Sequence, residues 1–475
     1  MKRLTLPSLA ALGLACLTAG TFSGCSSGDS CVSTREYFAN EILSGAMKQC
    51  AGCHEPGGLA SEKGAEFLLL PSTYPGFLDA NLEAVREMAK NEYDGTPLLL
   101  AKPSGLTEHG GGVVIEDGDE NYKKIADLIS QLDSPVECAN DDLEASYEGV
   151  TFLDETETLR KAALHLVGRL PTQAEVDRVS EGGDEALALV LEEMMEEDAF
   201  YERLTEMWGD LLLTDRYLAY TGFAVNLLDP EAVPNAGEWY GDLEGNDDYL
   251  VNRAVAQEPL DLINYIVRNN RPFTEILTAD YTVFNSYSAG LYQPEGVSFS
   301  EPDYTTFKEG KITMLAEGQP LNIPHAGILS SPMFLNRFPT TPTNRNRHRA
   351  RMVLKLFLAT DILKIAERPI DPSAPTEYNN PTRDNPACSV CHNIIDPLAG
   401  SFQKYDDNDQ EEYTPEREWY TDMVSPGYGE ETMPTSEYNQ ALPWLAKRAA
   451  DDPRFVLGTI YTTYTALTGL APLDY

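Results

Sequence analysis

Apolar side chains recur at helical spacing along most of this chain. Phe38, Ile42 and Met47 share one face of a predicted helix, and Ser33 and Glu36 form a capping box at its start. The same spacing predicts further helices over residues 122–132, 159–170, 186–195, 200–213, 260–267, 352–358, 444–448 and 455–467. The predicted fold class is therefore mainly α.

Irregular stretches divide the predicted helices into three regions. Residues 55–119 are rich in Gly and Pro and lead to a closing helix, which predicts a small domain over 31–138. Residues 139–310 are expected to be helical with long polar loops, and residues 311–475 form a second helical region. At 475 residues the chain is long enough for roughly two to four domains.

The amino terminus predicts an export signal over residues 1–25. A basic start precedes an apolar stretch over 4–17, which is too short to cross a bilayer. The four residues that end at Cys25 resemble a bacterial lipobox, although Phe22 stands where Leu is usual. A lipidated Cys25 would anchor the protein as a periplasmic, outer-membrane or cell-surface lipoprotein.

The net charge limits the classes of partner. Asp and Glu number 76 against 35 Lys and Arg, which gives a formal net charge of −41. Such an excess repels nucleic acid and anionic membrane surfaces, so neither is expected to bind. It favours solubility and a basic partner without identifying that partner.

Two C-x-x-C-H runs carry the clearest chemistry: Cys50-Ala51-Gly52-Cys53-His54 and Cys388-Ser389-Val390-Cys391-His392. Two thiols three residues apart on a helical turn can each bond one haem vinyl group, and the histidine that follows can bind the iron. A single C-x-x-C also fits a redox pair or half of a zinc site. Two copies, each followed by histidine, predict two covalently bound haem c groups with His54 and His392 as proximal ligands.

The first motif lies between two further cysteines, Cys31 and Cys138. In an oxidising compartment they are expected to form a disulfide that closes the first domain. Loop closure over this span is worth about 4 kcal/mol. The alternative is a pair of buried thiols.

His109 is the predicted distal ligand of the first haem. Three glycines follow it, and a chain without side chains can approach the haem edge closely. Met88 is the alternative ligand, although its surroundings resemble an ordinary helix. His109 could also be a histidine in a surface loop.

The distal ligand of the second haem is predicted to be His325, because a Pro-His-Ala-Gly turn can present its side chain freely. His348, Met333 and Met433 stay open as alternatives. Four arginines within residues 345–351 have two interpretations. They pair with haem propionates, or they begin a solvated helix and pair with nearby acids.

An acidic loop follows the second motif. Oxygen-bearing side chains over 405–409 alternate in a way that a calcium ion could use. The loop lacks the glycine and the final glutamate of an EF-hand, so an ordinary turn is favoured.

Four stretches of the chain resemble the planctomycete-type multidomain c-type cytochromes, which are secreted or lipidated. These stretches are 50–54 with 109–112, Leu164–Pro171 with Glu175, Arg271–Tyr281 with Asn285, and Cys388–Gly400 with Phe402 and Tyr405. The resemblance spans most of the mature chain, and its last stretch is the most specific. It implies haem binding and electron transfer. The family commonly has glycine where this chain has the acidic residues 407–409, so nothing is carried over for that loop.

These observations favour an exported dihaem c-type cytochrome that transfers electrons to or from a redox partner. In this view the small cytochrome c domain precedes a larger helical region with the second haem site. The first alternative is a dihaem peroxidase or oxygenase, in which one iron has an open position and His325 or His348 serves as a distal base. The second alternative is a surface-attached scaffold that binds a partner.

Overall fold

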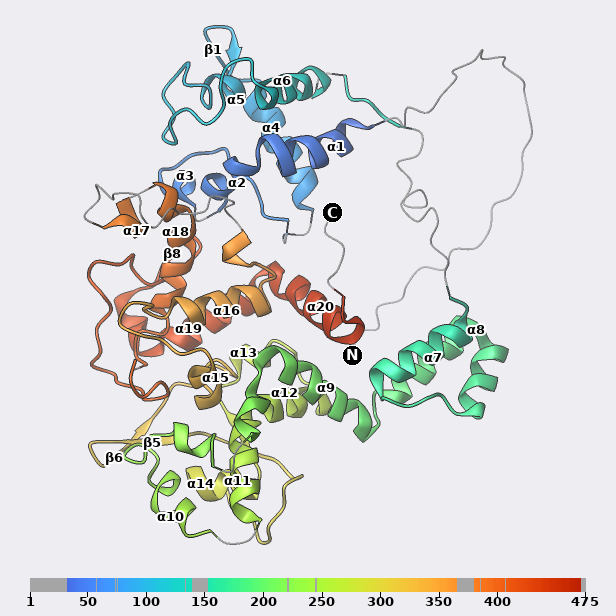
Figure 1. The fold of residues 1–475 in the computed structure, drawn as a ribbon, viewed down its shortest axis with the longest axis vertical. Helices are drawn as coiled ribbons and strands as arrows, with labels where there is room; N and C mark the ends of the chain where they lie inside the picture. The colour runs from blue at the N-terminus through green and yellow to red at the C-terminus, as the bar shows by residue number, and fades with distance from the viewer. Residues whose placement is uncertain are drawn as a thin grey trace.

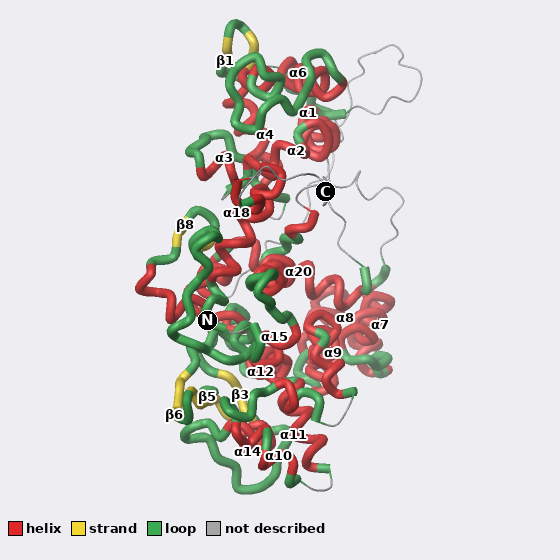
Figure 2. The backbone as a smooth tube through the Cα atoms, turned by 60° about the vertical axis from the view of Figure 1, so that its left-hand side comes forward, coloured by secondary structure: helices red, strands yellow, loops and turns green. Residues whose placement is uncertain are grey.

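The computed structural model describes residues 32–470, apart from 57, 73, 75, 133, 139–152, 220–221, 244–245, 365–379, 385 and 406. Helices dominate this part of the chain, and its strands form four two-stranded antiparallel pairs (Figures 1 and 2). The predicted mainly α class is confirmed. Within the same residues, none of the helices has both the length and the apolar character that crossing a membrane requires.

The first region surrounds a small core of its own, at the top of Figure 1. One of the two bonds of the predicted capping box is present at its first helix, where the Ser33 hydroxyl accepts the backbone N–H of Glu36 at 3.1 Å. Phe38, Ile42 and Leu128 are fully buried in the core. The elements are α1 (Thr34–Tyr37), the π-helical η1 (Phe38–Ala46), α2 (Lys48–His54), α3 (Leu59–Glu62), α4 (Phe77–Ala89), β1 (Glu92–Tyr93), β2 (Thr96–Pro97), α5 (Leu98–Ala101) and α6 (Glu120–Leu132).

The middle region begins with a pair of helices, α7 and α8, that pack around a second small core. Gly183, with a φ of 60°, interrupts α8, which explains why helical spacing in the sequence begins only at 186. The elements are α7 (Glu155–Leu166), α8 (Gln173–Met194), α9 (Asp198–Leu212), η3 (Thr214–Leu218), η4 (Val225–Leu227), η5 (Pro234–Ala236), α10 (Glu238–Gly241), α11 (Asp247–Ala256), α12 (Glu258–Arg268), α13 (Glu275–Thr278), β3 (Thr282–Phe284), α14 (Ser286–Tyr292) and β4 (Lys308–Gly310).

The last region completes the largest core, which runs without a break from Leu204 on α9 to Phe455 on α20. One hydrophobic core therefore extends across position 310. The elements are β5 (Thr313–Ala316), β6 (Gln319–Asn322), α15 (Pro332–Arg337), α16 (Arg347–Phe357), η6 (Ile362–Lys364), α17 (Pro381–Asp384), α18 (Pro386–Gly400), β7 (Gly427–Tyr428), β8 (Glu431–Thr432), η7 (Thr435–Gln440), α19 (Ala441–Asp451) and α20 (Pro453–Thr468).

The first and last regions meet where α2 and α3 contact α18. Figures 1 and 2 both show α2 beside α18, although 338 positions separate His54 from His392. The Ser61 hydroxyl donates to the Glu430 carboxylate across the same junction. The fold therefore brings the two C-x-x-C-H helices into contact.

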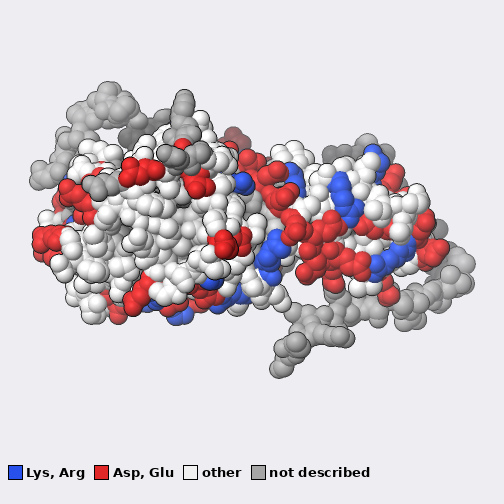
Figure 3. Space-filling view, turned by 90° about the horizontal axis from the view of Figure 1, so that it is seen from below, with Lys and Arg blue, Asp and Glu red and all other residues white. Residues whose placement is uncertain are grey.

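The excess of acidic residues is visible on the surface. On the face in Figure 3, Asp and Glu side chains gather most densely toward the right, with Lys and Arg side chains among them. In Figure 1, helices α7 and α8 lie toward that side. Carboxylates spread over a solvated surface favour solubility, as the composition predicts.

Candidate functional site

The first motif lies on α2, and its His54 is the last residue of that helix. Cys50, Cys53 and His54 fall within this short helix, and both cysteines are partly buried. Burial, with a smaller effect from Cys53, raises the pKa of the Cys50 thiol to about 12. The helix therefore presents two cysteines, with the Cys50 thiol protonated, and an imidazole at its end.

The ring nitrogens of His54 and His109 have matching environments. Nδ1 of His54 lies 2.7 Å from the carbonyl oxygen of Phe67, and Nδ1 of His109 lies 2.9 Å from that of Gly112. A nitrogen that bonds to a carbonyl must carry the hydrogen, so Nε2 of each neutral ring keeps its lone pair. Burial lowers the pKa of His54, outweighing the hydrogen bond to Phe67, and so favours its neutral form. Both rings are therefore prepared to bind a metal through Nε2.

The spacing of the two rings fits one metal ion between them. Their centres lie 6.2 Å apart and their planes differ by 10°. Two metal–imidazole bonds of about 2 Å, with about 1.1 Å from each nitrogen to its ring centre, require about 6 Å between centres when both Nε2 atoms point at the ion. The structure therefore brings His109, the predicted distal ligand, to the distance from His54 that a shared iron requires.

The glycines after His109 are not equivalent. A Cβ atom at Gly111 would lie 3.2 Å from Cε1 of His109 and 3.6 Å from Nδ1, whereas one at Gly110 would meet nothing within 4 Å. Gly111 therefore leaves room for the imidazole ring itself. Met88, the alternative ligand, lies on α4 and packs against the first core.

The second motif lies on α18, near the residue that follows the first. Cys388 and Cys391 are free and partly buried. Burial raises the pKa of the Cys391 thiol, and the charge of Glu55 adds to this effect. Since Glu55 directly follows His54, the two attachment sites are close enough to interact electrostatically.

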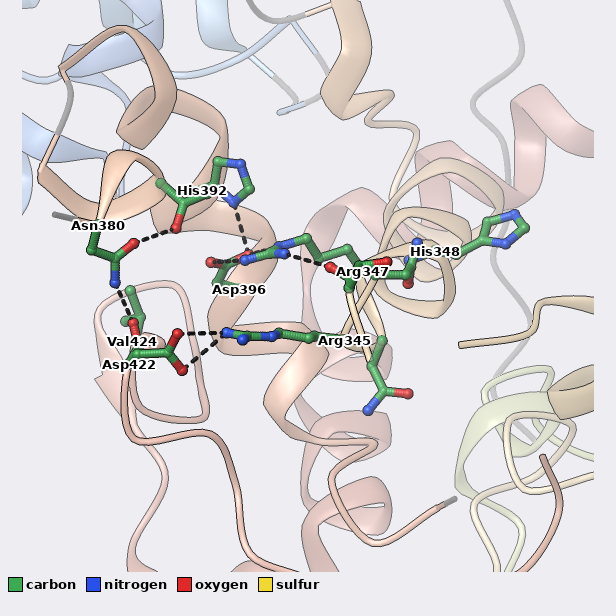
Figure 4. A network of polar contacts seen from close by, with 12 residues as sticks. Arg345, Arg347, His348, Asn380, His392, Asp396, Asp422 and Val424 are labelled. Atoms are coloured by element: carbon green, nitrogen blue, oxygen red, sulfur yellow. Dashed lines mark hydrogen bonds and ion pairs between the residues drawn. The ribbon is translucent and has the colours of Figure 1, made fainter. Parts of the chain in front are cut away.

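His392 has an ionic partner that His54 lacks. Its Nδ1 lies 3.0 Å from Oδ1 of Asp396, and Arg347 donates to both carboxylate oxygens at 2.6 and 2.9 Å (Figure 4). Burial alone would raise the pKa of Asp396, but the hydrogen bonds from Arg347 and His392 outweigh it and lower the pKa. An ionised carboxylate at this place holds the hydrogen on Nδ1 and directs the Nε2 lone pair outward.

The structure does not bring His325 to His392. His325 is buried after β6, and its Nε2 accepts the backbone N–H of Ile312 at 2.9 Å, so the ligand atom is already engaged. Its charged neighbours are Lys311 and Asp280. Burial lowers the pKa of His325 to about 4. His325 is therefore a histidine of the protein core. The Pro-His-Ala-Gly turn, on which its prediction as a ligand was based, folds into the interior.

The other three alternatives also have partners elsewhere. His348 packs edge-on against Phe338 and points away from His392 in Figure 4. Met333 is fully buried in the largest core, and Met433 packs with Ala441 and Trp444. Among the described residues, no hydrogen bond, ring contact or ion pair joins any of the three to His392.

Three of the arginines of residues 345–351 pair with acids, as the second interpretation predicts, but Arg349 is buried and not solvated. Three pair with acids and the fourth is buried among carbonyl groups: Arg345 with Asp422, Arg347 with Asp396, Arg351 with Asp361, and Arg349 with the carbonyls of Leu335, Phe338 and Gln410. Figure 4 shows the first two pairs side by side next to α18. The run therefore ties α16 to α18 and to the loop at 422.

The described residues cover the predicted disulfide and the acidic loop only in part. Cys138 is disulfide-bonded, whereas Cys31, its predicted partner, lies outside the described residues together with residues 1–25. In the acidic loop, the Asp407 carboxylate pairs with Arg417 at 3.2 Å. That carboxylate of the proposed calcium loop therefore already faces a guanidinium.

A small cavity of about 70 Å³ lies between the two motifs. Glu55 and Tyr74 line it from the first region, and Asn393, Tyr428 and Arg454 from the last. Burial raises the pKa of Glu55 to about 7 against the opposing charge of Arg454. Polar groups thus line the contact between the attachment helices.

Arg454 lies at this junction and contacts both regions. It donates to both oxygens of Asp452 at 3.0 and 2.9 Å, and its guanidinium lies 4.9 Å from the centre of the Tyr74 ring. Arg454 and Tyr74 have no signal in the sequence that marks them as partners. Only Asp396 has a local signal, because it stands four positions after His392 on one helix and must share its face.

Comparisons with protein-family models, with curated proteins and with solved structures find no match for this chain.

Proposed function

We propose that this protein is an exported dihaem c-type cytochrome that transfers electrons in the periplasm or at the cell surface. The observation that carries the proposal is the contact between two C-x-x-C-H helices, one of which holds its histidine opposite a second imidazole. Bound haem supplies reversible one-electron chemistry, and the protein sets its ligands, burial and hydrogen bonds.

The residues divide into three roles. Cys50, Cys53, Cys388 and Cys391 form the thioether bonds, and His54 and His392 are the proximal ligands. His109 is the distal ligand at the first site. Electron exchange between two sites requires that they be close, and the contact between α2 and α18 supports this requirement.

Export and attachment complete the proposal. The lipobox-like residues before Cys25 and the Cys138 disulfide both suit a compartment outside the cytoplasm. The resemblance to planctomycete-type c-type cytochromes supports the same location. The strongly acidic surface favours a redox partner with basic residues around its docking surface.

A specific observation favours a second candidate function. None of His325, His348, Met333 and Met433 has a contact with His392 among the described residues. An iron held by His392 alone on one side would accept an external ligand, as in a peroxidase or oxygenase.

Absorption spectra of the purified ferric and ferrous protein test both candidates. The electron carrier predicts two attached haems per chain, both low-spin and indifferent to carbon monoxide and peroxide. One high-spin haem that binds carbon monoxide would favour the second candidate instead. The variant Cys388→Ser/Cys391→Ser serves as the matched control, since it should keep only the first haem. Fewer than two haems in the unaltered protein would contradict both candidates.

A further inference from the structure

We propose that Asp396, clamped by Arg347, is a positioning residue that lowers the reduction potential of the haem held by His392. The inference rests on the proposed function, since it requires a haem at the second motif. It concerns a carboxylate–imidazole pair that has no counterpart at His54, where the acceptor is a neutral carbonyl.

The hydrogen bond is a product of helix geometry. His392 and Asp396 are four positions apart on α18, so their side chains lie on one face one turn apart. The separation of 3.0 Å between Nδ1 and Oδ1 therefore needs no distortion of the helix. Helix α18 continues to Gly400, beyond this pair, with Pro397 inside it directly after Asp396.

Burial and the arginine keep the carboxylate in place. Asp396 is 2% exposed, and Arg347 binds both of its oxygens, so the group cannot turn toward solvent. Figure 4 shows the guanidinium and the imidazole converging on Asp396 from different elements. A bidentate pair of this kind adds geometric precision as well as energy.

The turn that delivers Arg347 is itself firmly held. Arg345 and Asn346 have φ values of 54° and 66°, a conformation that is uncommon for arginine and more readily adopted by asparagine. Asn346 is 2% exposed, its N–H donates to the Thr340 hydroxyl, and its side chain donates to the carbonyl of Phe402. The position of Arg347 is therefore specified by the fold around α18.

The chemical effect follows from the charge of the acceptor. A carboxylate draws the Nδ1 hydrogen more strongly than a carbonyl does, which makes Nε2 a more basic ligand. A more basic ligand stabilises the more positively charged ferric state over the ferrous state. In a buried site this electrostatic effect is stronger than in water.

The deciding measurement is a spectroelectrochemical titration of the purified full-length protein with both haems in place. The Asp396→Asn variant should raise the potential of the second haem by a tenfold to hundredfold change in the ferric–ferrous equilibrium, about 59–118 mV for one electron. The first haem should keep its potential, and His109→Ala assigns the two waves because it alters the first haem alone. Asp396→Glu, which restores the charge, should move the potential back toward the original value.

A matched control lies next to the pair. Asp422 pairs with Arg345 through both oxygens and has no contact with His392, so Asp422→Asn should leave both potentials unchanged. An equal shift in this control, equal shifts of both haems, or no shift in Asp396→Asn would overturn the inference. Fewer than two attached haems in the unaltered protein would overturn it together with the proposed function.

A second variant covers the case in which Asp396→Asn does not mature. Arg347→Gln removes the positive charge and leaves the carboxylate, so it should shift the second potential downward. A merely structural role predicts no such opposite sign. An unchanged or raised potential in Arg347→Gln would therefore count against the inference.

Discussion

Helices α2 and α18 carry the same attachment motif in different surroundings. At α2, His54 bonds to the carbonyl of Phe67 and faces a second imidazole. At α18, His392 bonds to a buried carboxylate, and within the described residues no hydrogen bond, ring contact or ion pair joins it to a predicted distal ligand. If haem is bound as proposed, the motif alone would specify where it is attached, whereas the neighbouring residues would decide how each iron is coordinated.

The length of each helix explains the difference. Helix α2 ends at His54 and the chain turns to an extended conformation at Glu55, so His54 has no helical neighbour four positions later. Its Nδ1 therefore takes a partner from the following loop. Helix α18 continues for two turns beyond His392, and Asp396 falls on the same face. Where a helix stops thus selects a neutral or an ionic partner for the histidine.

The largest expected effect is a change of iron spin state, which should distinguish the two sites by their distal ligands. His109→Ala removes one of two facing imidazoles and should convert the first haem completely from low-spin to high-spin. His348→Ala should change neither haem, because that ring packs against Phe338. Ferric absorption and electron paramagnetic resonance spectra measure both effects. A low-spin first haem in His109→Ala, or a spin change in His348→Ala, would break the comparison.

The next effect concerns the junction that both sites share. Arg454→Ala leaves Asp452 buried without its cation, which should cost about 3–5 kcal/mol of unfolding free energy. Lys447→Ala is the control. Its partner Asp451 is well exposed, so the loss should stay below about 1 kcal/mol. Denaturant unfolding followed by circular dichroism gives both values, and similar losses would refute the junction's role.

His325 tests the comparison through the unfolding free energy of the protein. His325→Leu leaves the Ile312 N–H without an acceptor and should cost about 1–3 kcal/mol, while both haem spectra stay unchanged. Any change in the spectrum of the second haem would restore His325 as its ligand.

The same residue makes a prediction about pH. Burial lowers the pKa of His325 to about 4, so its contribution is present above about pH 6.5 and is lost as the pH falls toward 4. The loss amounts to roughly 3 kcal/mol over this window. Unfolding free energies measured from pH 4.5 to 7.5 should therefore decline in the unaltered protein more steeply than in His325→Leu. Parallel curves would contradict the assignment.

The smallest effect tests the glycines beside His109. Gly111→Ala crowds the imidazole and should force it off its preferred rotamer at a cost of about 1 kcal/mol, which is roughly a fivefold weaker ligation equilibrium. Gly110→Ala meets no atom and should behave like the unaltered protein. A small high-spin fraction in the ferric spectrum, present only in Gly111→Ala, is the expected result.

Local patterns predicted more of this protein than distant ones did. The helical spacing over 122–132, 260–267 and 455–467 falls inside α6, α12 and α20. His109 was predicted as a ligand from the glycines beside it, and its ring lies 6.2 Å from that of His54, which leaves the ligand role a prediction. His325 was chosen on the same kind of local evidence. Its burial depends on Ile312 and Asp280, which the Pro-His-Ala-Gly turn does not reveal.

Residues that act across the fold had weaker signals. Arg454 and Tyr74 become neighbours only when the first and last regions meet, and nothing in either stretch indicates the other. Asp396 could have been found, since its spacing from His392 is helical. The arginines of 345–351 drew attention through their charge, but the acids that pair with them lie up to 77 positions away.

The contact between α2 and α18 also constrains the order of assembly. Synthesis proceeds at about 5–20 residues per second, so the first motif exists roughly 20 to 70 seconds before the second. During that interval the face of α2 that meets α18 is uncovered. If haem is attached as proposed, it could be joined to Cys50 and Cys53 before the second motif exists, whereas the second site would mature beside a finished one. The two motif helices are therefore synthesised at different times, although they lie in contact in the folded protein.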